Sequence, residues 1–335
     1  MNRRKPHNRP DDTKDEFERI AWLSKVFAQR RTRAGVDLGI GDDAAILSSS
    51  RQRWVWTVDA CVEHVHFDWN WLSPEDVGWR SFQAAVSDIA AMGAEPVAAL
   101  SSMALPDSVN TALWRGIVRG QSRAATSLEC PVIGGNLSRA AEVSLHTTVL
   151  GRTNKPILRS GALPGDELWL VGVVGAAAAG LSVLRRVPER DRSPAMRACL
   201  RAWRRPTALI KEGLQLRGRA HAAIDVSDGI AGDAGHISES SGVRLVLERQ
   251  ALEQAAGPRV RQVATEMGRA VLDWVLLGGE DYALLAAGPA SRRPTFATRI
   301  GCVERGKGVW LDSVGAKRVP IGPGFDHFRG NVAST

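Results

Sequence analysis

One stretch, Gly39-Ile40-Gly41-Asp42-Asp43-Ala44-Ala45, places two glycines before two adjacent carboxylates and small apolar residues after them. Glycine lets the backbone bend tightly and approach a ligand closely. Adjacent carboxylates repel each other, so a buried pair needs a cation or a proton between them. Taken alone, the stretch favours an exposed turn, because Gly-Asp is common turn chemistry.

The rest of the chain repeats this pattern of acidic residues among small ones, at Val58-Asp59-Ala60, Ser87-Asp88-Ile89, Asp225-Val226-Ser227-Asp228-Gly229 and Gly278-Gly279-Glu280-Asp281. No cysteine or histidine adjoins the first stretch, so its ligand atoms are oxygens, which Mg²⁺ prefers. The aspartates are too many for one acid–base pair. They suit several Mg²⁺ ions around a polyphosphate, where catalysis depends on positioning and charge neutralisation.

The composition bounds the class of protein. The chain has 335 residues and 44% hydrophobic content, enough for a sizeable core and about two domains. No apolar run reaches ~18 residues, so no transmembrane helix is expected. The basic residues 1–14 lack a following apolar segment, so we expect a disordered arm rather than a signal peptide. The four cysteines show no Cys-x-x-Cys spacing, which favours free thiols and a cytoplasmic location.

The net charge of +8 raises the possibility of nucleic-acid binding. Much of the surplus lies in the first ten residues and in the arginine-rich residues 184–205, and no nucleic-acid motif accompanies it. We therefore expect a solvated arginine-rich helix and no nucleic-acid partner.

Local signals predict the elements that carry the acidic residues. Residues 54–59 form a predicted strand that ends at Asp59. Ser73 and Pro74 are a strong helix start, and that helix continues to about residue 92 with Asp88 on a stripe of small residues. A strand over residues 222–225 precedes a helix over 230–241, whose free amides offer an anion site with Ser227.

The remaining segments predict the overall organisation. Residues 131–133 are expected to form a short buried strand that ends at Gly134-Gly135-Asn136. Residues 152–165 contain two prolines and two glycines and are the best linker candidate. This divides the chain into residues 15–152 and 153–335. Helices are also predicted over residues 15–30, 110–128, from 176 and over 206–219, and strands over 97–105, 142–150 and 167–173 and near 244–247, 282–286, 298–303 and 309–312.

Taken in order, these motifs resemble the thiamine-monophosphate kinase family. The resemblance rests on residues 39–45, Val58-Asp59 with Val65-His66-Phe67, and residues 87–96, 159–166, 224–229 and 278–282, and it covers residues 15–328. The Ser-Asp-Ile-Ala-Ala-Met-Gly-Ala stretch is shared with aminoimidazole ribonucleotide synthetase, selenophosphate synthetase and the hydrogenase maturation protein HypE.

The resemblance implies an α+β fold, an α/β sandwich of the PurM-like type with two domains. The N-terminal domain (residues 15–152) would bind ATP and Mg²⁺ and form a β-barrel with its copy in a homodimer, beside a C-terminal α/β domain (residues 153–335). The implied enzyme is a cytoplasmic kinase of thiamine diphosphate biosynthesis. It would transfer the γ-phosphoryl group of ATP directly to thiamine monophosphate, without a covalent phospho-enzyme and with no nucleic-acid or membrane partner.

The resemblance also implies contacts by motif position. Contacts to several Mg²⁺ ions fall on Asp43, Thr57, Val58 (through its carbonyl), Asp59, Asp88, Asn136, Asp225 and Asp228. Contacts to ATP fall on Gly135, Asn136, Arg159 and Ser227, and contacts to thiamine monophosphate on His66, Glu280 and Phe325. Asn136 stands where the family usually has aspartate. A neutral amide oxygen should bind one Mg²⁺ less tightly, so we expect a raised Mg²⁺ requirement rather than an inactive protein.

Two alternatives remain open. The first is another ATP-using enzyme of the superfamily, a synthetase or a HypE-like protein. The terminal cysteine of HypE-like proteins is missing from Val332-Ala333-Ser334-Thr335, and the first sixty residues lack the cysteine of selenophosphate synthetase. The second is a non-catalytic nucleotide-binding protein that has degenerated at Asn136.

Overall fold

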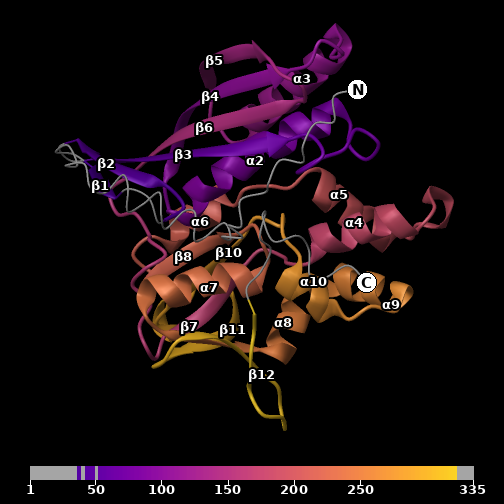
Figure 1. Ribbon diagram of the computed structural model, residues 1–335. Helices are drawn as coiled ribbons and strands as arrows, with labels where there is room; N and C mark the ends of the chain where they lie inside the picture. The colour runs from indigo at the N-terminus through magenta and orange to yellow at the C-terminus, as the bar shows by residue number, and fades with distance from the viewer. Residues whose placement is uncertain (1–35, 39–41, 50–51, 323–335) are drawn as a thin grey trace, which may run out of the picture.

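The computed structural model describes residues 36–38, 42–49 and 52–322. These residues form two β-sheets with helices packed on them (Figure 1). The predicted basic arm of residues 1–14, the predicted helix over residues 15–30 and Phe325 lie outside the described residues.

The first sheet contains six strands in the order β1 (Val36–Leu38), β2 (Ala45–Ser49), β3 (Gln52–Val62), β6 (Ser144–Thr153), β4 (Glu95–Leu105) and β5 (Val132–Arg139). Neighbouring strands are antiparallel except β4 and β5, which are parallel. Because β1 and β5 lie at the two edges, this sheet is open and does not close into a barrel within one chain.

Two helices, α2 (Pro74–Ala91) and α3 (Thr111–Ser127), cover one face of this sheet. Both begin where the sequence predicts. The side chain of Ser73 accepts a hydrogen bond from the amide of Asp76, and that of Asn110 accepts one from the amide of Leu113. Val55 and Phe82 are fully buried between the helices and the sheet.

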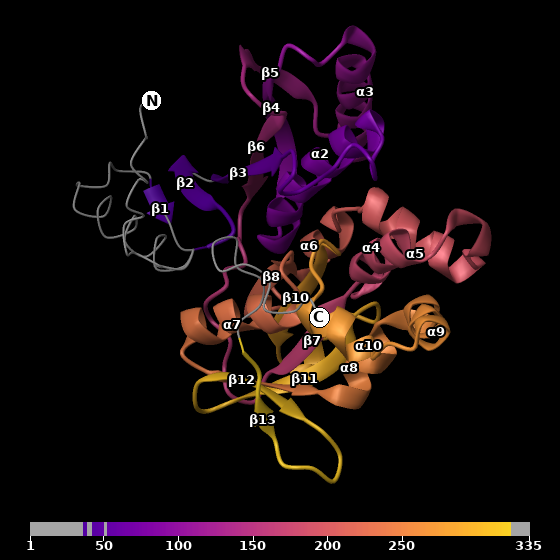
Figure 2. The ribbon, with the colours of Figure 1, turned by 45° about the vertical axis from the view of Figure 1, so that its right-hand side comes forward.

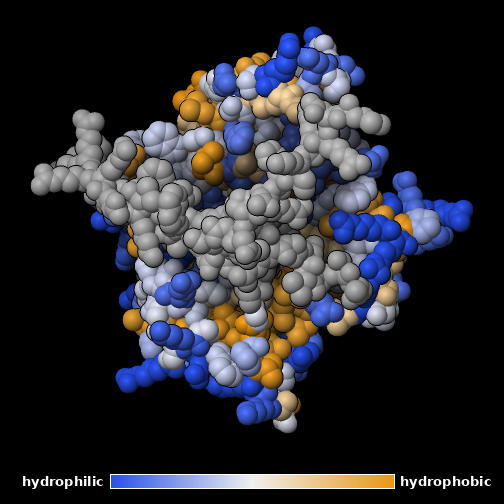
Figure 3. All heavy atoms as spheres, in the orientation of Figure 1, coloured by the Kyte–Doolittle hydropathy of each residue, from blue (hydrophilic) through white to orange (hydrophobic). Residues whose placement is uncertain are grey.

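The opposite face of the first sheet is exposed and apolar, and Figure 3 shows hydrophobic residues over β4 and β5. Trp56 and Leu100 are nearly half exposed, and Ile133 is 70% exposed. The prediction of a short buried strand at residues 131–133 is therefore wrong. Strand β5 continues through Gly134-Gly135-Asn136 and is exposed, because it is an edge strand that no element of the described residues covers.

The second sheet is also mixed, with the order β13 (Val319–Pro320), β12 (Gly308–Asp312), β9 (Arg244–Glu248), β11 (Thr298–Glu304), β7 (Glu167–Val171), β10 (Ala283–Gly288) and β8 (Ala222–Val226). Its helices are α4 (Ala176–Arg186), α5 (Pro194–Arg204), α6 (Ile210–Leu216), α7 (Ile230–Ser241), α8 (Arg249–Ala255), α9 (Gly257–Met267) and α10 (Val271–Leu277). One face of the sheet packs under α7, α8 and α10.

Two helix predictions need correction. The helix predicted over residues 206–219 is limited to α6, since Pro206 and the residues after it are not helical. The arginine-rich residues 184–205 form the end of α4 and all of α5 rather than one solvated helix. Helix α5 is amphipathic and buries Trp203, which is only 2% exposed.

Helix α2 lies between the two sheets (Figure 2). Its last turn, Ala90 and Ala91, packs against Trp169 and Ala223 of the second sheet. The predicted linker is also fixed in place, because the amide of Ile157 donates to the Met92 carbonyl at 3.0 Å and Ile157 is buried. Helix α2 therefore packs against both sheets: Phe82 lies in the core of the first sheet, and Ala90 and Ala91 contact the second.

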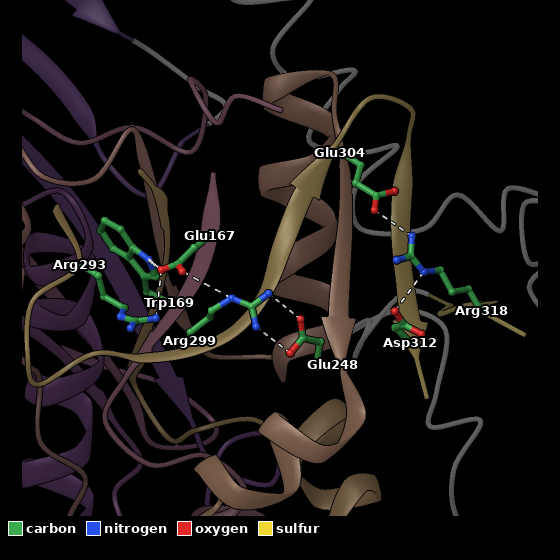
Figure 4. A network of polar contacts seen from close by, with 8 residues as sticks. All are labelled: Glu167, Trp169, Glu248, Arg293, Arg299, Glu304, Asp312 and Arg318. Atoms are coloured by element: carbon green, nitrogen blue, oxygen red, sulfur yellow. Dashed lines mark hydrogen bonds and ion pairs between the residues drawn. The ribbon is translucent and has the colours of Figure 1, made fainter. Parts of the chain in front are cut away.

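The strands of the second sheet are joined by ion pairs (Figure 4). Arg299 on β11 binds Glu248 of β9 with two hydrogen bonds of 2.8 and 2.7 Å, and its Nε lies 3.5 Å from Glu167 of β7. Arg318 pairs in the same way with Glu304 and Asp312. Because the pairs are partly exposed, they contribute little to the free energy of unfolding, and their main effect is on the register between neighbouring strands.

Two further predictions concern the cysteines and the membrane. All four cysteines are free thiols, and Cys61, Cys130 and Cys199 are buried. Among the helices of residues 36–38, 42–49 and 52–322, none has the length and apolar character needed to cross a membrane.

Candidate active site

Strand β3 directs two polar side chains toward α2. Side chains alternate along a strand, and the residues on either side of Val58, Thr57 and Asp59, face the helices, whereas Val58 itself is 63% exposed. The Thr57 hydroxyl donates to Oδ2 of Asp88 on α2 at 2.5 Å. The strand and the helix therefore present their oxygen atoms to the same place.

Strand β8 brings a third element to this place. Ala223 packs against the end of α2, and Asp225, two residues later, lies on the same face of the strand. Asp225 is 4% exposed. The strand ends at Val226, one residue beyond the predicted end at Asp225, and α7 begins at Ile230, the predicted residue.

Asp43, Asp88 and Asp225 form a cluster in which one oxygen of each lies within 4.8 Å of the others. The three residues come from the segment before β2, from α2 and from β8, so three separate acidic motifs meet in space. Asp59 and Asp228, which the sequence groups with them, are not in this cluster. Oδ2 of Asp43 is buried and has no hydrogen-bond partner among the described residues. A buried acceptor without a donor is expected where a ligand completes the site.

Burial controls the ionisation of this cluster. It raises the pKa of Asp43 to about 8, while the Arg159 guanidinium lowers it and the carboxylates of Asp225 and Asp42 raise it further. Burial also raises the pKa of Asp88 well above its usual range, and Asp225 and Asp43 add to that increase. Without a cation, the cluster therefore retains protons at neutral pH.

Arg159 is held against the Gly-Asp-Asp stretch. Its Nε donates to Oδ1 of Asp43 at 2.7 Å, a second guanidinium nitrogen binds the same oxygen, and its backbone amide donates to Oδ2 of Asp42 at 3.0 Å. The segment predicted to be a linker thus supplies a cation to the carboxylate cluster.

The turn after β8 contains Ser227 and Asp228, and it also involves a residue that the sequence analysis missed. Asp233 is 1% exposed, and its Oδ2 accepts a hydrogen bond from the Asp228 amide at 3.2 Å. Burial raises the pKa of Asp233 well above its usual range, and the nearby Asp228 and Asp225 carboxylates raise it further. The sequence does contain a signal for Asp233, because it is an acidic residue in the first helical turn after Ser227 and Asp228.

Gly135 and Asn136 lie apart from the carboxylate cluster, on β5. A cavity of about 910 Å³ between α3 and β5 is lined by both residues and by the apolar side chains of Trp114 and Val118. Strand pairing aligns Asp59, Thr147, Ser101 and Gly135 in one row across the sheet. Three inter-strand spacings of ~4.8 Å separate the ends of this row by ~14 Å.

The structure describes two of the three residues predicted to bind thiamine monophosphate, His66 and Glu280. His66 follows β3, and its Nδ1 accepts a hydrogen bond from the Val62 amide at 3.1 Å. Glu280 precedes β10 and contacts Arg80 and Trp203. Phe325, as noted, is not among the described residues.

Comparison with known proteins agrees with this architecture. The family model for AIR synthase related protein, N-terminal domain, matches residues 41–153. HypE in complex with ATP superimposes with a TM-score of 0.66 over 84% of this chain and 88% of its own at 17% identity, a likeness of fold alone. The two sheets and their helices therefore define a protein of the PurM-like class.

Closer relatives identify the family. Thiamine-monophosphate kinase of Aquifex aeolicus is 33% identical over 291 residues, which are 86% of this chain and 92% of the relative. The structure "AaThiL complexed with AMPPCP and TMP" superimposes with a TM-score of 0.82 at 31% identity, over 91% of this chain and 96% of the other. The chain belongs to the thiamine-monophosphate kinase family.

Proposed function

We propose that this protein is an ATP-dependent kinase that phosphorylates thiamine monophosphate to thiamine diphosphate. The observation that carries the proposal is the convergence of Asp43, Asp88 and Asp225 from three separate segments. This cluster lies in a chain similar to a kinase solved with AMPPCP and TMP.

The residues present fit Mg²⁺. The cluster offers only oxygen ligands, and Oδ2 of Asp43 is buried without a donor. The residues that would hold several ions are Asp43, Thr57, Val58 through its carbonyl, Asp59, Asp88, Asn136, Asp225 and Asp228. Bound Mg²⁺ would neutralise the charge that develops on the transferred phosphoryl group.

ATP would extend from the carboxylate cluster toward β5. Arg159 and Ser227 would contact its phosphates, and Gly135 and Asn136 would meet the nucleoside at the cavity against α3. The ~14 Å row from Asp59 to Gly135 suits an extended nucleoside triphosphate. Catalysis is then mostly positioning, with no covalent intermediate.

The acceptor would be held by His66, Glu280 and Phe325. Because the Nδ1 of His66 accepts from the Val62 amide, the neutral ring carries its proton on Nε2. His66 can therefore donate to a phosphate oxygen through that one nitrogen. Phe325 would stack on the cationic thiazolium ring.

The assembly we propose is a cytoplasmic homodimer of two-domain subunits, residues 15–152 and 153–335. The exposed apolar face of the first sheet supports it, because a second copy would bury Trp56, Val58 and Leu100. Pairing of the two open sheets would form the β-barrel.

A coupled assay of ADP release, with and without thiamine monophosphate, tests the proposed function. We expect release that depends on thiamine monophosphate and on Mg²⁺. Release without it would favour a synthetase or HypE-like enzyme, and no release would favour a non-catalytic nucleotide-binding protein. Titrating activity against free Mg²⁺ in the wild type and in Asn136→Asp separates a raised Mg²⁺ requirement from lost catalysis. If Asn136 only raises the requirement, Asn136→Asp should reach a similar maximal rate at a lower Mg²⁺ concentration. If Asn136 abolishes catalysis, only Asn136→Asp should be active.

A further inference from the structure

Arg80 on α2 is a buried cation that none of the sequence motifs includes. It is 3% exposed, and it lies two helical turns before Asp88. One guanidinium nitrogen donates to Oε1 of Glu280, and another donates to the backbone carbonyl of Trp203. The guanidinium carbon also lies 5.1 Å from the centre of the Trp203 ring, which is a cation–π distance.

Trp203 holds the other oxygen of the same carboxylate. Its indole Nε1 donates to Oε2 of Glu280 at 3.0 Å. A carboxylate has about four lone-pair sites, and these two contacts use one on each oxygen. The Glu280 side chain is 32% exposed, so its remaining acceptor sites are accessible while its orientation is fixed from the buried side.

The backbone at Glu280 is held equally firmly. Glu280 has a φ of +66°, which is unusual for a residue with a side chain. Its amide donates to the carbonyl of Ser227 at 2.8 Å, beside the turn that contains Asp228. A side chain on Gly279 would lie 2.0 Å from the same carbonyl, so only glycine permits this approach. Such strained positions persist where the surroundings fix them and are frequent at ligand-binding sites.

We propose that Arg80 is a positioning residue that, together with Trp203, orients the Glu280 carboxylate toward the acceptor substrate. The proposal rests on the proposed function, in which Glu280 binds thiamine monophosphate. Arg80 is too deeply buried to touch the substrate itself. It acts by fixing which acceptor sites of Glu280 are free, and it links α2, which carries Asp88, to the acceptor subsite.

Kinetics of Arg80→Gln, Arg80→Lys and Trp203→Phe test this assignment in the full chain. For Arg80→Gln we expect the KM for thiamine monophosphate to rise about 10- to 100-fold, as for loss of a hydrogen bond between charged groups, with the KM for ATP unchanged. Arg80→Lys keeps the positive charge, so its KM for thiamine monophosphate should lie between those of the wild type and Arg80→Gln. Trp203→Phe keeps an aromatic ring but removes the indole N–H donor, and it should raise the same KM about 3- to 10-fold.

The matched control is Arg205→Gln. Arg205 joins α5 to Asp76 of α2 at 2.7 Å without contacting Glu280, so neither KM should change. In a Glu280→Gln background, Arg80→Gln should not raise the KM for thiamine monophosphate any further. Calorimetric titration of nucleotide-free protein with thiamine monophosphate should rank the affinities of the variants in the same order as their KM values.

The outcomes separate the two proposals. A wild-type protein that neither binds nor phosphorylates thiamine monophosphate would overturn the proposed function and this assignment with it. A wild-type protein that does both, with Arg80→Gln changing both KM values equally, changing neither, or adding to Glu280→Gln, would overturn the assignment alone.

Discussion

Arg159 and Asp43, 116 residues apart in the sequence, form an ion pair in which Nε donates to Oδ1 at 2.7 Å. The cation predicted to contact ATP is therefore bound to a carboxylate predicted to contact Mg²⁺. A bound nucleotide–metal complex has to redistribute these contacts, because Asp43 and the phosphates would compete for the same guanidinium.

Replacing Arg159 tests this competition. Arg159→Gln should raise the KM for ATP about 10- to 100-fold, since a hydrogen bond between charged groups is lost. It should not weaken Mg²⁺ binding to nucleotide-free protein, because Asp43 loses its competing cation. Steady-state kinetics and calorimetric titration with Mg²⁺ measure the two effects. A large loss of Mg²⁺ affinity would contradict the competition.

Asp88 should be required for turnover but not for folding. Asp88→Asn should lower kcat by about 100-fold or more at saturating Mg²⁺, the size seen when one stabilising group at a reacting centre is lost. The melting temperature should stay equal or rise, because asparagine is neutral at every pH and removes a buried acid whose ionised form burial and the neighbouring Asp225 and Asp43 disfavour. Asp312→Asn, at the surface beside Arg318, is the control and should leave kcat unchanged. Near-normal activity of Asp88→Asn would show that the metal assignment is wrong.

The stability of the metal-free protein should depend on pH. Burial raises the pKa of Asp43 from 3.8 to about 8, so the native state keeps a proton that the unfolded chain releases. The free energy of unfolding should therefore fall as pH rises from about 4 to about 8, by ~1.4 kcal/mol per unit for each retained proton. Mg²⁺ competes with these protons, so its stabilising effect should grow over that range.

Urea unfolding between pH 5 and pH 8, with EDTA and with Mg²⁺, measures this dependence. The Asp43→Asn variant serves as its control and should show a shallower slope in EDTA. Equal stabilisation by Mg²⁺ at pH 5 and pH 8 would contradict the prediction.

Gly135 and Gly134 provide a matched pair of substitutions on β5. A Cβ at Gly135 would lie 1.8 Å from the Ser101 carbonyl, whereas a Cβ at Gly134 would meet only the Leu100 side chain at 3.3 Å. Gly135→Ala should therefore push β5 away from β4 and raise the KM for ATP about tenfold, which corresponds to ~1.4 kcal/mol. Gly134→Ala should have little effect. Equal KM values for both variants would argue against nucleotide binding at this cavity.

The exposed face of the first sheet should mediate dimerisation. Leu100 on β4 is 42% exposed and lies in the same row of this face as Val58, and Leu100→Glu should place a charge in the interface and yield a folded monomer at micromolar concentration. Val314→Glu, in a loop where Val314 is 95% exposed, should leave the dimer intact. Sedimentation velocity and circular dichroism distinguish dissociation from unfolding. A wild-type protein that sediments as a monomer would contradict the proposed assembly.

The sequence by itself determined the elements whose signals are local. Ser73 and Pro74 mark the start of α2 because capping involves neighbouring residues only. The turn from Asp225 into α7 was predictable for the same reason. Of the five aspartates that the sequence groups together, Asp43, Asp88 and Asp225 gather in one cluster, whereas Asp59 and Asp228 are not part of it. Predictions failed where an element's limits depend on its neighbours. Strand β5 continues through two glycines because β4 pairs with it, and its exposure follows from its place at the sheet edge.

Only the tertiary structure decided how the site is assembled. Arg80 and Glu280 are 200 residues apart, Arg159 and Asp43 are 116 apart, and no local pattern encodes either pair. Both contacts exist because α2 and the segment after β6 are packed between the two sheets. That packing is a sum of apolar contacts over the whole chain, such as Ala90 against Ala223, so it is fixed only when the chain folds as a unit.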